Sequence, residues 1–122
     1  MKLSALRIFV RDIEPCRAFY GQALGLQLQA DGAAHGYLVF ADAGIRIVVE
    51  TVPADAPADE QALVGRFTGV SFAVTDIHAE YAHLRARGVA FSGEPERQAW
   101  GGLLATLRDP AGNELQIVQY PR

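Results

Sequence analysis

The apolar residues of the chain follow two periods, and each change of period predicts a new element. Over residues 4–11, large aliphatic side chains recur at every second position, which is typical of a strand that buries one face. Over residues 12–25, apolar residues recur at i, i+3, i+4 and i+7, which is typical of a helix with one buried stripe. Asp12 is the expected N-cap, and Gly25 is the expected left-handed residue that ends the helix. The chain is therefore predicted to begin with a strand and a helix.

Three further strands are predicted before residue 52. They cover residues 26–30, 35–41 and 45–51, and turns at Asp31-Gly32 and Ala43-Gly44 separate them. The first part of the chain therefore has the order strand, helix and three strands.

The same pattern returns in the second half of the chain. Val10-Arg11-Asp12-Ile13 matches Val74-Thr75-Asp76-Ile77 at an offset of 64 residues, and Gly25 matches Gly88 at an offset of 63. Residues 52–66 lie between the repeats, are rich in Pro, Asp and Ala, and indicate a linker with room for one helical turn within residues 59–64. The second repeat ends in a predicted hairpin whose strands, residues 103–108 and 114–120, flank Asp109-Pro110-Ala111-Gly112. Two repeats of one unit are therefore expected.

Each repeat is expected to pack a helix against one face of its sheet and to leave the other face uncovered. In the first strand of each repeat, the covered positions are large and apolar. The uncovered positions are Ala5, Arg7 and Phe9 in the first repeat and Gly69, Ser71 and Ala73 in the second. Two such curved sheets side by side would leave a concave trough, which is the usual place for a ligand.

Composition limits the classes of partner and the compartment. The chain has 122 residues, which suits one domain, and a net charge of -3, which argues against nucleic acid or an anionic membrane as a partner. No apolar run is long enough to span a bilayer, and the first residues lead into a strand and not into a signal peptide. The single cysteine, Cys16, cannot form an internal disulfide, so a cytoplasmic protein is expected. Cys16 lies on the apolar helix stripe, where core packing is favoured over a nucleophilic role.

Several motifs occur in a fixed order along the chain. They are Val10-Arg11-Asp12-Ile13 with Phe19-Tyr20 and Leu24-Gly25-Leu26, Val74-Thr75-Asp76-Ile77 with Leu84 and Gly88-Val89, and Trp100-Gly101-Gly102 with Arg108-Asp109-Pro110-Ala111-Gly112-Asn113. Together they resemble the vicinal oxygen chelate superfamily, which includes glyoxalase I, extradiol dioxygenases, fosfomycin-resistance enzymes and bleomycin-binding resistance proteins. The resemblance implies an α+β fold in one glyoxalase-like domain. It consists of two βαβββ modules, residues 3–51 and 67–122, each a curved mixed sheet with a helix on its outer face. It also implies a homodimer.

The resemblance further implies four positions from which metal enzymes of this superfamily hold a divalent ion with His, Gln and Glu. In this chain these positions fall on Ala5, Arg46, Gly69 and Gln116. Ala and Gly have no donor atom, Arg is a permanent cation and Gln offers one weak amide oxygen. His78 and His83 are five residues apart on the second helix, and His35 is isolated. We therefore expect no metal centre and no cofactor.

Arg46 supports an alternative way to bind a ligand in the trough. With Arg7 near it and the Gln116 amide beside it, Arg46 would receive a carboxylate or phosphate through forked hydrogen bonds. The alternative is that Arg46 pairs with Glu50 or Glu114 and closes a vestigial site. The predicted wall for a planar ligand consists of Trp100, Tyr37, Phe9 and His35, although Trp100 would also suit a dimer contact.

The favoured function is a metal-free small-molecule binding protein of the bleomycin-resistance type, with an anionic or planar ligand in the trough. Its expected ligand-binding residues are Arg7, Phe9, His35, Tyr37, Arg46, Ser71, Trp100 and Gln116. No nucleophile–base pair is apparent, which disfavours an enzyme. The alternatives are a metal-dependent or His/Arg-based lyase, isomerase or dioxygenase of the same superfamily, and a purely structural dimeric module.

Overall fold

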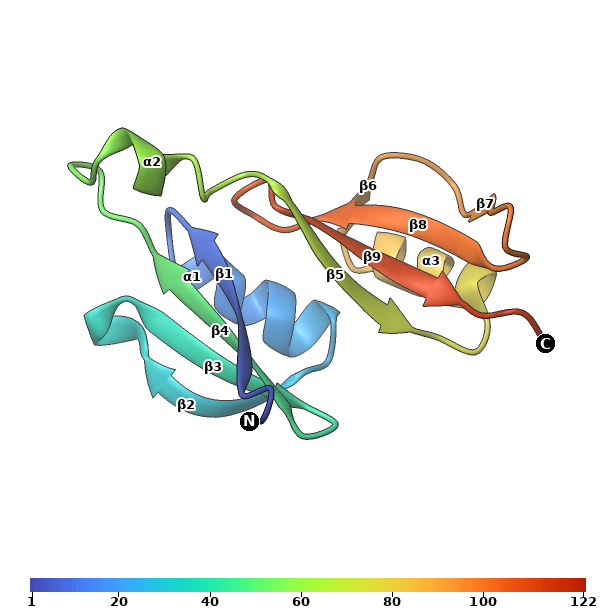
Figure 1. Cartoon of the computed structure of the whole chain (residues 1–122), viewed down its shortest axis with the longest axis horizontal. Helices are drawn as coiled ribbons and strands as arrows, with labels where there is room; N and C mark the ends of the chain where they lie inside the picture. The colour runs from blue at the N-terminus through green and yellow to red at the C-terminus, as the bar shows by residue number, and fades with distance from the viewer.

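The computed structural model describes residues 1–122 and contains two separate β-sheets, one in each half of the chain (Figure 1). The sheet of module 1 has the order β1-β4-β3-β2, in which β1 is parallel to β4 and the other pairs are antiparallel. Its strands are β1 (Ala5–Val10), β2 (Gln27–Gly32), β3 (Tyr37–Asp42) and β4 (Ile45–Thr51). The predicted α+β class is confirmed.

The helix of module 1 begins as α1 (Glu14–Cys16) and continues as a π-helix, η1 (Arg17–Ala23). The Asp12 carboxylate accepts the backbone N–H of Glu14 at 3.3 Å, and Gly25 follows the helix with a φ of +74°. In the wider π turn, the N–H of Leu24 donates to the carbonyl of Phe19 at 2.9 Å. The sequence predicted the helix but not this widening, because the apolar stripe of a short π segment has nearly the same spacing.

The connection between β2 and β3 differs from the prediction. β2 continues through Asp31 to Gly32, and a 3-10 turn, η2 (Ala33–His35), replaces the expected tight turn. Gly36 has a φ of +81° and reverses the chain after this turn. As a result β3 begins at Tyr37, and His35 lies in a turn and not at the start of a strand.

The linker is held against module 1. It contains α2 (Ala58–Gln61), which overlaps the predicted helical turn. The side-chain amide of Gln61 donates to the carbonyl oxygens of Pro53, Ala54 and Ala56, and its oxygen accepts from Arg11. The segment between the modules is therefore a folded connection and not a free spacer.

Module 2 repeats the order of module 1 and adds one short strand. Its helix is α3 (Ile77–Ala86). Asp76 is the N-cap, and its carboxylate accepts the N–H of Ala79. Gly88 follows the helix with a φ of +89°. The sheet has the order β5-β9-β8-β6, and β7 pairs with another part of β8. The strands are β5 (Phe67–Ala73), β6 (Ala90–Phe91), β7 (Glu96–Arg97), β8 (Leu103–Arg108) and β9 (Glu114–Gln119). The sequence analysis predicted no strand at the position of β7.

The helix-bearing faces of the two sheets meet in one hydrophobic core. Figure 1 shows α1 and η1 beside β1 and β4, and α3 behind β8 and β9. The largest buried apolar residues of this core come from both modules and include Ile8, Tyr20, Phe40, Ile77, Leu84, Leu107 and Leu115. Because the covered faces pack together, the uncovered face of each sheet lies on the outside of the chain. None of the helices is both long enough and apolar enough to span a bilayer.

A buried polar network joins the modules at the β8–β9 hairpin. The Asp109 carboxylate accepts four hydrogen bonds, of which the Tyr20 hydroxyl donates one at 2.7 Å across the module boundary. The Asn113 amide donates to the carbonyl of Phe9 on β1 at 2.7 Å, and its oxygen accepts the N–H groups of Gly65 and Arg66 in the linker. The hairpin therefore fixes β1 and the linker relative to module 2.

Candidate functional site

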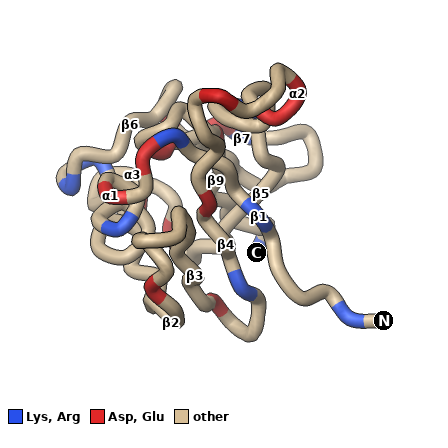
Figure 2. The backbone as a smooth tube through the Cα atoms, turned by 90° about the vertical axis from the view of Figure 1, so that its left-hand side faces the viewer, with Lys and Arg blue, Asp and Glu red and all other residues tan.

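The uncovered face of module 1 presents three rows of side chains across β1, β4 and β3. The rows are Ala5, Arg46 and Ala41; Arg7, Val48 and Val39; and Phe9, Glu50 and Tyr37. Four residues predicted to bind a ligand lie in these rows, and they come from all three strands. The two arginines occupy different rows, and Figure 2 shows the basic positions of β1 and β4 as two separate blue segments.

Arg7 is already paired within the chain. Its Nε and Nη2 atoms donate to the two oxygens of Glu50 at 2.8 and 2.7 Å, and its guanidinium lies 5.1 Å from the centre of the Phe9 ring. The hydrogen bonds and charge of Glu50 raise the pKa of Arg7 above its ordinary value. The forked face of Arg7 is therefore occupied by Glu50, and the help of Arg7 in binding an anion beside Arg46 stays a prediction.

Arg46 has no such partner. The two carboxylates expected to neutralise it are engaged elsewhere, because Glu50 binds Arg7 and Glu114 lies 4.0 Å from Arg108. Arg46 itself makes no ion pair and no side-chain hydrogen bond within the chain, and it is exposed near the start of β4. Of the two alternatives for this residue, closure by an internal ion pair is excluded, and a free guanidinium remains on the uncovered face.

Tyr37 and His35 lie near one edge of this face. The Tyr37 ring packs directly over Gly32, where a Cβ atom would lie 2.1 Å from the ring, so a larger residue at this point of β2 would displace the ring. His35 is exposed in η2 and makes no side-chain hydrogen bond. A tyrosine–histidine acid–base pair is therefore not assembled, whereas Tyr37 and Phe9 do share a row as aromatic side chains.

The uncovered face of module 2 has different chemistry. Ser71 on β5 and Thr106 on β8 both lie opposite Gln116 on β9. The Gln116 Nε2 donates to the Thr106 Oγ1 at 3.2 Å, which fixes the direction of the amide, while Ser71 is exposed. This row is neutral and contains hydrogen-bonding groups without a cation.

Next to Gln116, the loop before β8 encloses a polar cavity of about 200 Å³. Its polar lining residues are Ser92, Glu94, Glu96, Gln98, Thr106 and Gln116. Of these residues, only Gln116 was predicted from the sequence to bind a ligand. Thr106 was within reach, because the hairpin register follows from the turn, but the loop residues were not, because nothing in their pattern predicts that they fold back over β8.

Within one chain, Trp100 lies apart from the other residues of the predicted aromatic wall. Its ring covers Gly102 and lies 6.0 Å from the Tyr120 ring, and the residue is 51% exposed. In Figure 1, the β7–β8 connection that carries Trp100 lies at the far end of module 2 from module 1. Trp100 therefore belongs to a separate aromatic pair in the single chain, and its role in a ligand wall or a dimer contact stays a prediction.

The uncovered faces of the two modules do not enclose a common cavity in the chain. One cavity of about 310 Å³ adjoins Arg7, Phe9 and Glu50 and is completed by linker residues. The cavity at Gln116 is lined by module 2 alone, and Arg46 lines neither of them. The predicted ligand-binding residues in the strands therefore lie on two separate sheet faces within the chain.

Cys16 is fully buried and supplies no nucleophile. Burial, followed by the negative charges of Asp109 and Asp12, raises the pKa of its thiol to about 12. The reactive thiolate is therefore strongly disfavoured near neutral pH. The predicted role of Cys16 in core packing agrees with this environment.

The sequence that forms the two βαβββ modules matches a known protein family. The family model of the glyoxalase/bleomycin resistance protein/dioxygenase superfamily matches residues 2–117. The chain belongs to this superfamily. It is 31% identical to the uncharacterized protein YurT of Bacillus subtilis (strain 168), and the match covers 98% of this chain and 99% of YurT.

Solved structures of superfamily members have the same fold. A superfamily member from Sphaerobacter thermophilus DSM 20745 is 27% identical with a TM-score of 0.78, and the match covers 98% of this chain and 97% of that one. TnmS3, an antibiotic binding protein from Streptomyces sp. CB03234, is 28% identical with a TM-score of 0.76, and the match covers 98% and 96% of the two chains. Both similarities extend over both modules.

The residues at the four expected ligand positions do not fit the divalent ion of the superfamily's metal enzymes. Ala5 and Gly69 offer no donor atom, Arg46 is a cation, and Gln116 offers only one weak amide oxygen. No group of three or more His, Cys, Asp and Glu side chains gathers elsewhere in the chain in a way that could hold a metal ion. No reaction step through a metal is therefore derived for this protein.

The strand register corrects one of these four positions. In module 2, Ser71 lies opposite Gln116, whereas in module 1 Arg7, which is 64 residues before Ser71, lies opposite Val48. Val48 is thus the counterpart of Gln116, and Arg46 is displaced from that position by two residues on the same face. The residues that match between the two repeats lie only in the first strand and the helix. The sequence therefore offered no reference residue for aligning β4 with β9. The corrected position, Val48, also lacks a donor atom.

Proposed function

We propose that this protein binds a small anionic or planar molecule without a metal ion, in a trough formed between module 1 of one copy and module 2 of a second copy. The observation that carries the proposal is the unpaired Arg46 guanidinium on the uncovered face of module 1. An exposed arginine without an acidic partner retains all of its donors for a carboxylate or phosphate. Phe9 and Tyr37 on the same face supply flat apolar surface.

The division of the site between two half-sites supports the homodimer. A drug-sized ligand is normally enclosed by a concave pocket of about 300–1,000 Å³. Each uncovered sheet face, taken alone, lacks an opposite wall, and the covered faces are already packed together in the core. A second copy that places its Gln116 face opposite the Arg46 face would close the trough. The antibiotic binding protein TnmS3 supports small-molecule binding in this superfamily.

A mixed dimer tests this assignment with 2-naphthoate as a planar anionic probe. We expect Arg46→Ala and Gln116→Ala each to weaken binding about tenfold as homodimers, through loss of a charged or a neutral hydrogen bond. The charge-matched control Arg85→Ala, on α3, is expected to bind normally. After the two variants are unfolded and refolded together, the mixed dimer has one trough with both original residues. Calorimetry should then recover original affinity at half the sites of that dimer.

Three results would contradict the proposal. Recovery would be absent if both residues acted on a ligand within one chain. A monomer by light scattering at micromolar concentration would remove the second wall. The purified protein could also contain one equivalent of zinc, nickel, iron or manganese per chain. If chelation removed both this metal and 2-naphthoate binding, the site would be a metal site and not an arginine-based one.

A further inference from the structure

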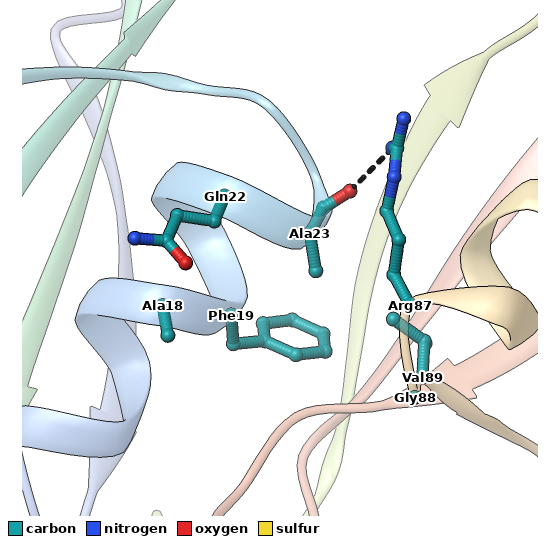
Figure 3. Close-up of a pocket in the computed structure, with 7 residues that line it drawn as sticks. All are labelled: Ala18, Phe19, Gln22, Ala23, Arg87, Gly88 and Val89. Atoms are coloured by element: carbon teal, nitrogen blue, oxygen red, sulfur yellow. Dashed lines mark hydrogen bonds between the residues drawn. The ribbon is translucent and has the colours of Figure 1, made fainter.

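The helical side of the chain carries a cavity that is separate from the trough. It has a volume of about 500 Å³ and lies between η1 of module 1 and the end of α3 in module 2 (Figure 3). Its apolar floor is formed by Phe19 and Val89, which are 8% and 6% exposed. Figure 3 shows the Phe19 ring directed from η1 toward Val89, with Ala18 and Ala23 on the same side of the opening.

A guanidinium group is fixed at the rim of this cavity. The Nη1 atom of Arg87 donates to the carbonyl of Ala23 at 3.0 Å, across the module boundary. The backbone of Arg87 is held by the cap of α3, in which the N–H of Val89 donates to the Leu84 carbonyl and Gly88 takes a φ of +89°. The cation is therefore held at both ends of the side chain before any ligand arrives.

The same contact leaves part of Arg87 free. The Nε and Nη2 atoms, which form the side-on fork of the guanidinium, make no hydrogen bond within the chain, and Arg87 forms no ion pair. This fork matches the two oxygens of a carboxylate. Because the side chain is already oriented, a ligand would lose less conformational entropy on binding than it would at a mobile arginine.

The end of η1 supplies the acceptor for Arg87. Ala23 is the last residue of η1, and the last carbonyl groups of a helix have no N–H partner within the helix. The carbonyl of Ala23 instead accepts the hydrogen bond from Arg87. The helix end therefore orients the cation over the apolar floor.

We propose that the cavity between η1 and α3 binds a small amphipathic carboxylate, whose carboxylate bonds the Arg87 fork and whose apolar body lies on Phe19 and Val89. The site is independent of the trough, because it lies on the helix side of both sheets. Its volume falls within the range that encloses small organic ligands. Since its two walls belong to different modules, the bound molecule would also bridge them.

Octanoate is the test probe, and octanamide is its neutral counterpart of equal length. In amide-resolved NMR titrations of the full chain, octanoate is expected to give saturable shifts centred on residues 18, 19, 87 and 89, with a dissociation constant on the order of 1 mM or lower. Octanamide is expected to bind about fivefold to tenfold more weakly, because it cannot form the charged fork.

Matched variants separate the site from general charge effects. Arg87→Gln should weaken octanoate about fivefold to tenfold and leave octanamide unchanged. The control is Arg85→Gln, which removes the same charge from the same helix but from a guanidinium stacked 5.4 Å from the centre of the Tyr81 ring, outside the cavity. Ala18→Trp, at an exposed position, should fill the opening and abolish binding while the fold is retained.

Each contrary result overturns the proposal. Equal losses in Arg87→Gln and Arg85→Gln would mean nonspecific attraction of the anion. Shifts centred on β1, β4, β5 or β9 would place octanoate in the trough, and undiminished binding in Ala18→Trp would exclude the cavity. Absence of saturable shifts would also overturn it. The Arg46 site is tested separately, by 2-naphthoate binding to the Arg46→Ala variant.

Discussion

In module 1 the uncovered sheet face carries Arg7, Arg46 and Phe9, whereas in module 2 the matching positions carry Ser71, Glu114 and Ala73. The backbones follow one plan, with the same parallel pair and the same helix on one side. The covered faces resemble each other because both must fill a close-packed core. The uncovered faces differ because no packing constraint selects their side chains. The repeats therefore differ most on these faces, of which one is basic and the other is neutral to acidic.

The hairpins of the two modules show a second difference. The β3–β4 turn of module 1, Asp42-Ala43-Gly44, is exposed, and its Ala43 and Gly44 both have positive φ. The β8–β9 turn of module 2 instead carries two buried polar side chains, Asp109 and Asn113, that bond module 1 and the linker. One turn only reverses the chain, while the other joins the two halves of the molecule.

The largest expected effect comes from removing the hydrogen bonds that connect the β8–β9 turn to module 1 and the linker. Asn113→Ala removes four side-chain hydrogen bonds and leaves part-buried backbone groups of Phe9, Gly65 and Arg66 without those partners. We expect the free energy of unfolding to fall by about 3–4 kcal/mol in urea titrations. Asp42→Ala, in the exposed turn of module 1, is the matched control and should change stability by about 0.5 kcal/mol or less. Similar losses in the two variants would mean that the hairpins do not differ energetically.

The contacts of Asp109 and Asn113 between the modules are a part of the fold that the sequence did not predict. Period changes, the repeat and the turn residues predicted both modules and most strands, because local periodicity reports burial directly. Asp109 was predicted only as a turn residue, and Asn113 was not singled out. Its partners Phe9 and Gly65 lie far away in sequence, and no local pattern indicates such a contact.

The candidate site was less predictable than the fold. Alternation correctly placed Arg7, Arg46 and Gln116 on uncovered faces. It could not show that Glu50 engages Arg7 and leaves Arg46 free, because both arginines lie on the same face within reach of acidic residues. Trp100 and the loop around Glu94 depend on irregular connections, in which neither period nor register constrains the side chains.

Tyr20→Phe removes only the bond that crosses from η1 to Asp109. We expect a loss of about 1–2 kcal/mol at pH 7, because the buried carboxylate keeps its other three donors. Burial, then the charge of Asp109 and its hydrogen bond, raises the pKa of the Tyr20 hydroxyl above its ordinary value. Above about pH 10 the unfolded chain releases this proton while the native chain retains it, so the free energy of unfolding falls as pH rises.

The variant should therefore lose stability less steeply than the original chain between about pH 9.5 and 11, as followed by thermal denaturation in that range. Cys16 titrates in the same direction, so Cys16→Ala provides the reference for its contribution. Parallel pH profiles for Tyr20→Phe and the original protein would show that the Tyr20 hydroxyl is not held protonated by this environment.

Gly69 tests a backbone difference between the modules. It has a φ of +75° at the register shift of β5, whereas its counterpart Ala5 lies in regular β1. A Cβ at Gly69 would meet no close neighbour, so Gly69→Ala should cost about 1 kcal/mol from conformation alone. Gly93→Ala is the control, because Gly93 has an ordinary φ and open space, and it should cost almost nothing. Equal denaturation midpoints for the two variants would mean that the positive φ is not costly.

The smallest expected effect concerns the ion pair that distinguishes Arg7 from Arg46. The Arg7 side chain is 61% exposed, so a double-mutant cycle of Arg7→Ala and Glu50→Ala should give a coupling of only about 0.5 kcal/mol, further reduced in 1 M NaCl. A coupling above about 2 kcal/mol would indicate a structural pair instead. Glu50→Gln should free the Arg7 fork and strengthen 2-naphthoate binding severalfold. If calorimetry shows no gain, the neutralisation of Arg7 does not explain why Arg46 alone supplies the available charge.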